Sequence, residues 1–209
     1  MSQSTAIRVL IVDDHAIVRQ GLAAMIENEP DMTVVGQAGN GQEAIDQYRQ
    51  LQPDVTLMDL RMPQVSGVDA TIAICAEFAH ARIIILTTYD GDEDIYRGLR
   101  AGAKGYLLKD AEPDELLNAI HVVHNGQQYI PPHVGAKLAQ RLNNPELTDR
   151  ELEVLLLVAQ GMSNLQISAA LTITENTVKS NINHILSKLG AKDRTQATII
   201  ALKRGIAVL

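Results

Sequence analysis

Four sites along this chain place a polar side chain directly after a short apolar run. They are Asp13 and Asp14 after residues 9–12, Asp59 after 55–58, Thr87 after 83–86, and Lys109 after 106–108. Carboxylate oxygens are the ligands that Mg²⁺ prefers, and hydroxyl and ammonium groups bind phosphate oxygens. If the fold gathers these side chains in one pocket, that pocket suits a divalent cation together with a phosphoryl group.

The apolar runs predict the elements that must position these residues. Short apolar runs separated by helical stretches are typical of parallel strands buried on both faces. A further strand is expected at 33–35, and helices are expected near 15–29, 41–51, 66–79, 92–101 and 113–124. This alternation predicts an α/β fold, a (βα)5 doubly wound parallel sheet. Ligands of such sheets bind beyond the carboxyl ends of the strands, so we expect the four sites to converge there.

Three converging carboxylates repel one another, and without a counter-ion the pKa of at least one of them would rise. Mg²⁺ removes that conflict and neutralises charge on a transferring phosphoryl group, so that a carboxylate can attack it to give an acyl phosphate. Lys109 would supply a positive charge to the product and Thr87 a hydroxyl donor. Each residue alone also fits an ordinary cap, turn or surface position. Their joint order at four strand ends favours the site.

At these residues the chain resembles the receiver domain of bacterial two-component response regulators. The resemblance spans residues 6–125 and lies in Val12-Asp13-Asp14, Leu57-Met58-Asp59-Leu60-Arg61-Met62-Pro63, Ile85-Leu86-Thr87 and Gly105-Tyr106-Leu107-Leu108-Lys109. It implies a flavodoxin-like fold and a sensor histidine kinase as partner. It also implies that Asp59 is the phospho-acceptor, and that Asp13, Asp14, Asp59 and the backbone carbonyl of Arg61 hold Mg²⁺. Thr87 and Lys109 would read the phosphate, and Tyr106 would turn inward when Thr87 moves.

Two points of this resemblance stay open. An ordinary strand position explains Tyr106 equally well, because strands favour aromatic residues. Many receivers have proline where this chain has Asp110, which leaves the geometry of the 109–110 peptide bond undecided, since a non-proline cis bond costs about 3 kcal/mol or more.

The remainder of the chain has a different pattern. Residues 126–146 contain Gly126, Pro131-Pro132 and Asn143-Asn144-Pro145 and are expected to form a linker, with room for a helical turn or two at 137–142. Helices are expected near 149–160, 164–170, 175–189 and 195–204, with capping-box spacing at Thr148–Glu151 and Ser163–Gln166. We therefore predict three parts: residues 1–125, a linker at 126–146, and a small all-α domain of four helices at 147–209.

The predicted helix at 175–189 carries one apolar face, formed by Val178, Ile182, Ile185, Leu186 and Leu189. Lys, Asn and Ser occupy the opposite face, which suits the major groove of DNA as well as it suits solvent. The segments 147–155, 161–164, 174–179 and 185–189 together resemble the LuxR-type helix-turn-helix over residues 147–206. With the receiver, the whole chain resembles a NarL/FixJ-type response regulator.

That resemblance assigns further roles. It makes 163–170 the positioning helix and 175–189 the recognition helix. The implied contacts to double-stranded DNA come from Thr177, Lys179, Ser180 and Asn183, and the implied dimer contacts from Ile199, Leu202 and Ile206. The family usually has a basic residue where Leu165 stands and histidine where Asn181 stands. Loss of a phosphate contact at Leu165 would make the salt dependence of DNA binding shallower.

Charge and composition agree with this division. The net charge of −7 divides into −10 for residues 1–125 and +3 for residues 126–209, so nucleic acid is expected to meet only the C-terminal part. Cys75 is the only cysteine, which excludes an intrachain disulfide framework and fits a reducing cytoplasm. We expect a cytoplasmic protein with no membrane partner, because there is neither a signal sequence nor a long apolar run. His121, His124 and His133 are expected to be surface residues, not metal ligands.

The function that follows is a DNA-binding transcription regulator switched by Mg²⁺-dependent phosphorylation of Asp59. It is expected to dimerise on activation, with RNA polymerase as a further partner that this function allows. Two alternatives remain. One is a phosphatase of the haloacid-dehalogenase type, but that enzyme needs a carboxylate two residues after the nucleophile, where this chain has Arg61. The other is a DNA-binding protein with a vestigial receiver, against which the intact set of pocket residues argues.

Overall fold

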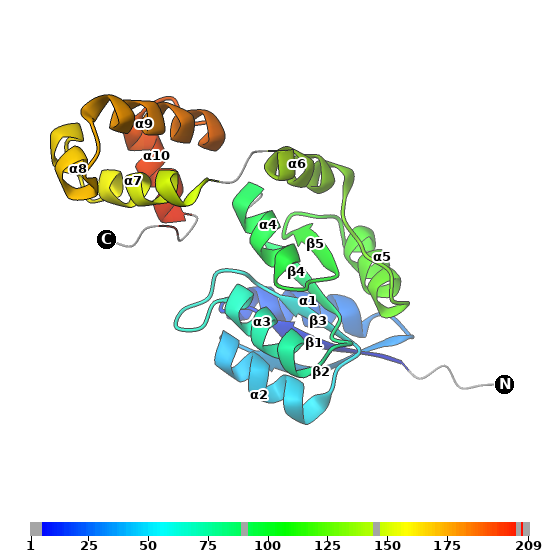
Figure 1. The fold of residues 1–209 in the computed structure, drawn as a ribbon. Helices are drawn as coiled ribbons and strands as arrows, with labels where there is room; N and C mark the ends of the chain where they lie inside the picture. The colour runs from blue at the N-terminus through cyan, green and yellow to red at the C-terminus, as the bar shows by residue number, and fades with distance from the viewer. Residues whose placement is uncertain (1–5, 89–91, 144–146, 204–205, 207–209) are drawn as a thin grey trace. The chain divides into compact units, whose positions relative to one another are not determined.

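The computed structural model describes residues 6–88, 92–143, 147–203 and 206. The chain divides into two compact units, Met1–Ala139 and Gln140–Leu209, and each is described by itself below. Figure 1 shows the elements of both units in chain order.

Unit 1 is built on a parallel sheet of five strands in the order β2-β1-β3-β4-β5. The strands are β1 (Ile7–Val12), β2 (Met32–Ala38), β3 (Val55–Met58), β4 (Ile83–Thr87) and β5 (Gly105–Leu108). Every residue of β3 and β4 is buried, as expected for parallel strands covered on both faces. The predicted doubly wound sheet is therefore confirmed, and its strand order reverses between β1 and β3.

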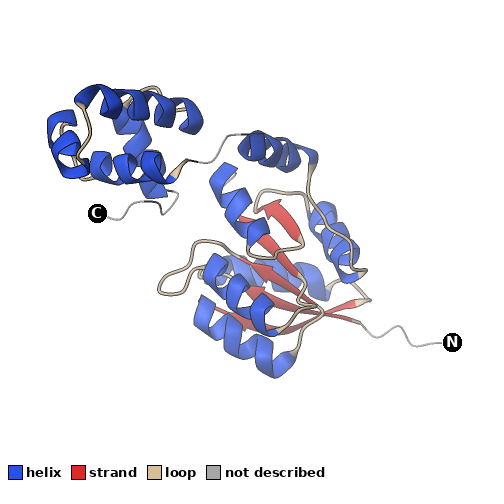
Figure 2. Ribbon diagram, in the orientation of Figure 1, coloured by secondary structure: helices blue, strands red, loops and turns tan. Residues whose placement is uncertain are grey.

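Helices cover both faces of this sheet (Figure 2). They are α1 (Ala16–Glu27), α2 (Gly41–Leu51), α3 (Gly67–Glu77), α4 (Asp92–Arg100) and α5 (Pro113–His124). Because side chains alternate along a strand, Val9 and Ile11 pack with α1 and α5, whereas Leu10 and Val12 pack with α2, α3 and α4. Two apolar cores thus clamp the strands and fix the edge at which they end.

Part of the expected linker is helical. Helix α6 (Pro132–Asn143) begins at a proline, which the first turn of a helix tolerates because that position needs no N–H donor. Val134 on α6 is fully buried in the core of unit 1, with Ile130 and Leu138 packed beside it. The segment after α5 is therefore a longer helix than the turn or two predicted from sequence, and it packs against the sheet unit.

Unit 2 consists of α7 (Asp149–Ala159), α8 (Asn164–Leu171), α9 (Glu175–Leu189) and α10 (Arg194–Lys203). Both predicted capping boxes are present, with Glu151 closing the first and Gln166 the second. Thr174 caps α9 by accepting a hydrogen bond from the backbone N–H of Thr177. The apolar face of α9 meets the other three helices through Val178 and Ile185, so the opposite face is left to solvent.

Candidate functional site

The predicted polar residues gather at the carboxyl edge of the sheet. Asp13 follows β1, Asp59 follows β3 and Lys109 follows β5. The backbone N–H of Asp59 donates to the carbonyl of Val12 over 2.8 Å, which ties the end of β3 to the end of β1. These two strands flank the point where the strand order reverses, which is where ligands of open α/β sheets bind.

The segment after Asp59 packs tightly against the Asp59 backbone. A Cβ atom on Gly67, the first residue of α3, would lie 1.8 Å from the Asp59 carbonyl oxygen, so only glycine fits there. The N–H of Gly67 donates to the carbonyl of Leu60 over 3.0 Å. The side chain of Asp59 is thereby presented from a rigid strand end and not from a mobile loop.

Lys109 bridges two carboxylates in this pocket. Its Nζ lies 2.6 Å from Oδ2 of Asp13 and 2.9 Å from Oδ2 of Asp59. The second oxygen of Asp59 accepts a weak hydrogen bond from the Arg61 backbone N–H at 3.4 Å. Asp13 and Asp59 are both almost fully buried, so the ammonium group is the principal counter-charge that each of them meets.

The pocket shifts the pKa values of its central pair in the same direction. Burial raises the pKa of Asp59 above 3.8, an effect that the Lys109 hydrogen bond opposes and the charge of Asp13 reinforces. Burial would lower the pKa of Lys109, but its hydrogen bonds to Asp13 and Asp59 outweigh that effect and raise it. The ionised carboxylate at residue 59 is thus held at a cost in free energy, which a further cation would reduce.

The donor set of this pocket fits a divalent cation. Asp13, Asp14, His15 and Asp59 each offer a ligand atom, and these atoms lie within 4.8 Å of one another. The Nδ1 atom of His15 is 2.7 Å from Asp14 Oδ1 and 3.2 Å from Asp13 Oδ1. Three carboxylates are the hard oxygen donors that Mg²⁺ accepts. The adjoining imidazole was not anticipated as part of the site, although its place beside the acidic pair was a visible signal.

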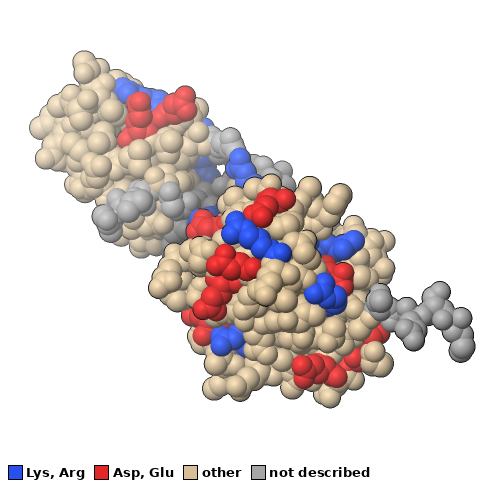
Figure 3. Space-filling model, turned by 90° about the horizontal axis from the view of Figure 1, so that it is seen from below, with Lys and Arg blue, Asp and Glu red and all other residues tan. Residues whose placement is uncertain are grey.

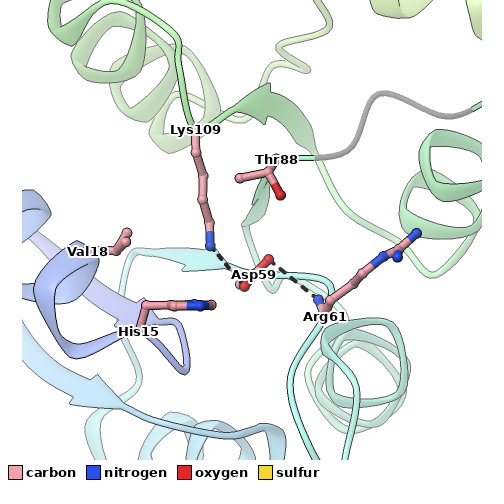
Figure 4. A pocket seen from close by; sticks show the side chains of 6 residues that line it. All are labelled: His15, Val18, Asp59, Arg61, Thr88 and Lys109. Carbon is pink, nitrogen blue, oxygen red and sulfur yellow. Dashed lines mark hydrogen bonds and ion pairs between the residues drawn. The ribbon is translucent and has the colours of Figure 1, made fainter.

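A cavity of about 290 Å³ opens over Asp59 and is lined by His15, Val18, Asp59, Arg61, Thr88 and Lys109 (Figure 4). It is large enough for a phosphoryl group with its donor atoms. Thr88, which directly follows the predicted Thr87, is one of these lining residues. Successive side chains of a strand point to opposite faces, and Thr87 is fully buried in the sheet.

The remaining predicted switch residue, Tyr106, is fully buried beside Leu60 and Ile85 in the core under α4. Its ring already lies inside the domain, which is the position that the family resemblance predicts for it after Thr87 has moved. The Lys109–Asp110 peptide bond is trans, as are the peptide bonds throughout the described ranges of the chain.

A second candidate site lies on α9 in unit 2. Thr177, Lys179, Ser180 and Asn183 are all exposed, on the side away from Val178 and Ile185. The Thr177 hydroxyl lies 2.9 Å from that of Thr174, so it takes part in the helix cap. Asn181, where the family usually has histidine, donates from Nδ2 to the Thr177 carbonyl over 2.8 Å and so belongs to the helix surface.

A partly buried ion pair braces this helix against α7. Glu151 is 4% exposed, and its Oε2 accepts from Lys188 Nζ on α9 at 2.7 Å and from the Thr148 backbone N–H at 2.8 Å. Burial alone would raise the pKa of Glu151, but these hydrogen bonds prevail and lower it below 4.5. Sequence reasoning found the capping role of Glu151 and missed its pairing with Lys188, 37 residues away.

The three residues predicted to form dimer contacts differ in exposure. Ile199 on α10 is 47% exposed. Leu202 and Ile206 are partly buried and pack against the core of unit 2. Ile199 is therefore the residue of the three with the most surface to offer a second copy.

Charged side chains of both signs are interspersed on the face drawn in Figure 3. The positive excess after residue 126 comes from nine Lys and Arg against six Asp and Glu. Among the described residues, no helix is both long and apolar enough to cross a membrane.

Comparison with known proteins matches both units. Residues 9–121 match the response regulator receiver domain, and residues 145–201 match the bacterial regulatory proteins of the luxR family. The transcriptional regulatory protein LiaR of Bacillus subtilis is 43% identical, with 93% of this chain and 96% of LiaR covered. The response regulator protein VraR of Staphylococcus epidermidis is 38% identical, with 96% and 99% covered.

Solved structures agree with these matches. A structure of the RcsB response regulator of Salmonella typhimurium has a TM-score of 0.83 and 26% identity, and covers 92% of this chain and 98% of its own. A structure of an RcsB–DNA complex has a TM-score of 0.78 at 26% identity, with 96% and 99% covered.

Proposed function

Since this chain belongs to the response regulators that join a receiver domain to a LuxR-type DNA-binding domain, we propose that phosphorylation of Asp59 by a sensor histidine kinase sets its affinity for DNA. One observation carries the proposal. Asp59 is buried at the strand-order reversal beside Asp13, with Lys109 in contact with both and an open cavity above it.

The proposed reaction uses the Asp59 carboxylate as a nucleophile. A carboxylate oxygen attacks the phosphorus of a phosphohistidine, a P–O bond forms, the P–N bond breaks, and the imidazole leaves with its bonding electron pair. The product is an acyl phosphate with about −1.5 to −2 of added charge. The Lys109 ammonium, already 2.9 Å from the carboxylate, is positioned to hold a phosphoryl oxygen by a charge-assisted hydrogen bond.

Asp13, Asp14, Asp59 and the Arg61 carbonyl are the groups proposed to hold Mg²⁺. When bound, the ion supplies positive charge that screens the carboxylates from one another and offsets charge on the phosphoryl group. The pKa of Asp59, which burial and Asp13 keep raised, supports this assignment because the pocket has a deficit of positive charge.

Thr87 and Tyr106 are proposed as the residues that report the phosphoryl group to the rest of the domain. Both are fully buried, Thr87 at the end of β4 and Tyr106 in β5 beside it. Thr88 lines the cavity in this structure, so a shift at the end of β4 would be needed to bring the Thr87 hydroxyl to the phosphate. A rearrangement at the end of β4 would then be felt by the ring packed next to it.

DNA binding is proposed for the exposed face of α9. Lys179, Ser180 and Asn183 would contact base edges, with Thr177 at the start of the helix near a phosphate. Dimerisation on activation, with Ile199 as the leading contact and Leu202 and Ile206 beneath it, would place two such helices on half-sites about one helical turn apart. RNA polymerase is a further partner consistent with this role.

We do not propose turnover of an external substrate. A phosphatase of the haloacid-dehalogenase type needs a general acid-base two residues after its nucleophile, and here Arg61 holds that position with its side chain paired to Asp94. At most, slow loss of the phosphoryl group from Asp59 itself is expected.

The test is to incubate the full chain with Mg²⁺ and a small phosphodonor and to follow intact mass and sedimentation together. We expect one phosphoryl group to be gained and dimers to form, and neither to occur with Asp59→Asn. Binding to DNA fragments is then compared with and without the donor. Equal phosphoryl gain in Asp59→Asn, or equal DNA affinity in both states, would refute the proposal, and steady hydrolysis of the donor would favour the phosphatase.

A control for the DNA contacts compares two exposed lysines of unit 2. Lys179→Ala removes the proposed groove contact, whereas Lys192→Ala removes the same charge after the end of α9. We expect Lys179→Ala to weaken specific binding by about 1–3 kcal/mol and Lys192→Ala to have a smaller, sequence-independent effect. Equal losses would remove α9 from the interface.

A further inference from the structure

Arg61 connects the phosphoryl pocket to helix α4 through two different groups. Its backbone N–H donates to Oδ1 of Asp59 at 3.4 Å. Its side chain points away from Asp59 (Figure 4), and Nη2 lies 2.9 Å from Oδ2 of Asp94 in the first turn of α4. One residue thus contacts the proposed phospho-acceptor and, at the same time, helix α4.

Helix α4 lies over the residues that the switch is proposed to move. Ile95, next to Asp94, is fully buried. At Gly98, one turn further on, an added Cβ would lie 3.2 Å from Ile85 and 3.7 Å from the ring of Tyr106. Asp94 is therefore carried by the helix that packs on Tyr106, and a force on its carboxylate acts on that packing.

We infer that Arg61 is a positioning residue with two alternative partners: it holds Asp94 while Asp59 is unmodified, and it turns to the phosphoryl group once Asp59 carries one. This inference rests on the proposed function of Asp59. The Arg61–Asp94 pair is partly exposed, with side chains 53% and 25% accessible, so it is held weakly. A phosphoryl group on residue 59 would bring about −1.5 to −2 of charge into a cavity that Arg61 already lines.

Asp94 and the phosphoryl group compete for the Arg61 guanidinium, so each weakens the binding of the other. Asp94 draws the guanidinium away from Asp59, so it opposes any step that brings the guanidinium to a phosphoryl oxygen. By linkage, the phosphoryl group in turn weakens the hold of Arg61 on α4 by the same factor. Phosphorylation would then release the first turn of α4 and leave the packing on Tyr106 free to change.

The test measures the affinity of the full chain for beryllofluoride, a phosphoryl mimic, by fluorine NMR in excess Mg²⁺. Asp94→Asn should tighten binding by about two- to fivefold, the range that a partly exposed ion pair supports. Arg61→Gln should weaken binding by a similar factor. In the Arg61→Gln background, Asp94→Asn should have no effect, because the group for which Asp94 competes is gone.

A merely structural ion pair predicts another pattern: both single substitutions would loosen α4 and move the affinity in the same direction. The matched control is Glu77→Gln, which breaks the exposed Arg49–Glu77 pair, also 2.9 Å long, between α2 and α3. It should leave beryllofluoride affinity unchanged.

The inference is overturned if Asp94→Asn weakens binding, or if its effect persists without Arg61. Failure of the wild-type chain to bind beryllofluoride at all would instead count against the proposed function of Asp59, so the two failures are distinguishable.

Discussion

Asp59 in unit 1 and Glu151 in unit 2 are both 4% exposed, and each contacts a lysine ammonium, at 2.9 Å and 2.7 Å respectively. Yet the pKa of Asp59 is raised and that of Glu151 is lowered. Glu151 accepts hydrogen bonds from Lys188 and from the Thr148 backbone N–H at the same oxygen. Asp59 shares its lysine with Asp13, and its other oxygen receives a long hydrogen bond from the Arg61 N–H.

The comparison shows that solvent exposure alone does not decide what a buried carboxylate can do: desolvation prevails at Asp59, whereas hydrogen bonds prevail at Glu151. A carboxylate that is well supplied with hydrogen bonds, as Glu151 is at Oε2, can hold two helices together. A carboxylate with too little positive charge around it, such as Asp59, is costly to keep ionised in the folded domain. Binding of a cation or chemical modification of the carboxylate lowers that cost. The first arrangement suits a scaffold for DNA binding, and the second suits a switch.

The largest effect is expected when Lys188, the partner of Glu151, is replaced, and this substitution tests the comparison most directly. Lys188→Met leaves the Glu151 carboxylate without its lysine partner, and we expect unit 2 to lose about 1–3 kcal/mol, the cost of leaving a buried acceptor without a hydrogen bond. Amide hydrogen exchange of α7 and α9 in the full chain measures the loss. Lys192→Met, which removes an exposed lysine of the same unit, is the control and should change exchange little. A loss no larger than that of the control would show that Glu151 does not depend on Lys188.

The corresponding change in unit 1 should have the opposite sign. Asp59→Asn removes a carboxylate whose ionisation is opposed by burial and by Asp13. We expect it to stabilise the unphosphorylated receiver by about 0.5–2 kcal/mol, as substitutions that relieve a functional site commonly do. Guanidinium unfolding followed through the exchange of β1 and β3 amides tests this, with the exposed Asp110→Asn as control. Destabilisation by Asp59→Asn would mean that the pocket is as well satisfied as the pair in unit 2.

Features of these sites that depend on local sequence patterns could be predicted, whereas features that depend on tertiary packing could not. Apolar runs marked the strand ends, and so the grouping of Asp13, Asp59 and Lys109, because parallel strands end at one edge of the sheet. The apolar runs could not predict that Thr88 lines the cavity, because adjacent residues of a strand point to opposite faces and the pattern locates a strand end only to within a residue.

Contacts between distant segments were also out of reach. Neither Arg61–Asp94 nor Lys188–Glu151 follows from periodicity, because each joins elements whose facing sides are chosen by tertiary packing. Helix α6 was underestimated because its prolines indicate a linker, whereas burial of Val134 provides the packing that stabilises a helix there.

Lowering the pH should change the stability contributions of Glu151 and Asp59 in opposite directions. The folded-state pKa of Glu151 lies below its ordinary value of 4.5, so the stability it contributes is complete above that value and is lost as the pH falls through the folded pKa. The pKa of Asp59 is raised, so protonation there favours the folded receiver as the pH falls.

Between about pH 6 and pH 3.5, we expect wild-type unit 2 to lose stability relative to Glu151→Gln. Over the same range, wild-type unit 1 should gain stability relative to Asp59→Asn. Amide exchange of the full chains at each pH reports both differences in one experiment. Parallel pH dependence of the two differences would contradict the assigned directions.

The smallest expected effects belong to a histidine beside each site. His15 and His184 are 67% and 65% exposed, with Nδ1 2.7 Å from Asp14 and 3.8 Å from Glu151 respectively. Replacing either by alanine should change the stability of its unit by less than about 0.5 kcal/mol, as for other exposed pairs. Only His15→Ala should alter Mg²⁺ affinity, raising it by less than about threefold, because the imidazole occupies carboxylate oxygens that the cation would use. Calorimetric titration of both variants with Mg²⁺ measures this affinity. An equal change of affinity in His184→Ala would show that Mg²⁺ does not bind at the receiver carboxylates alone.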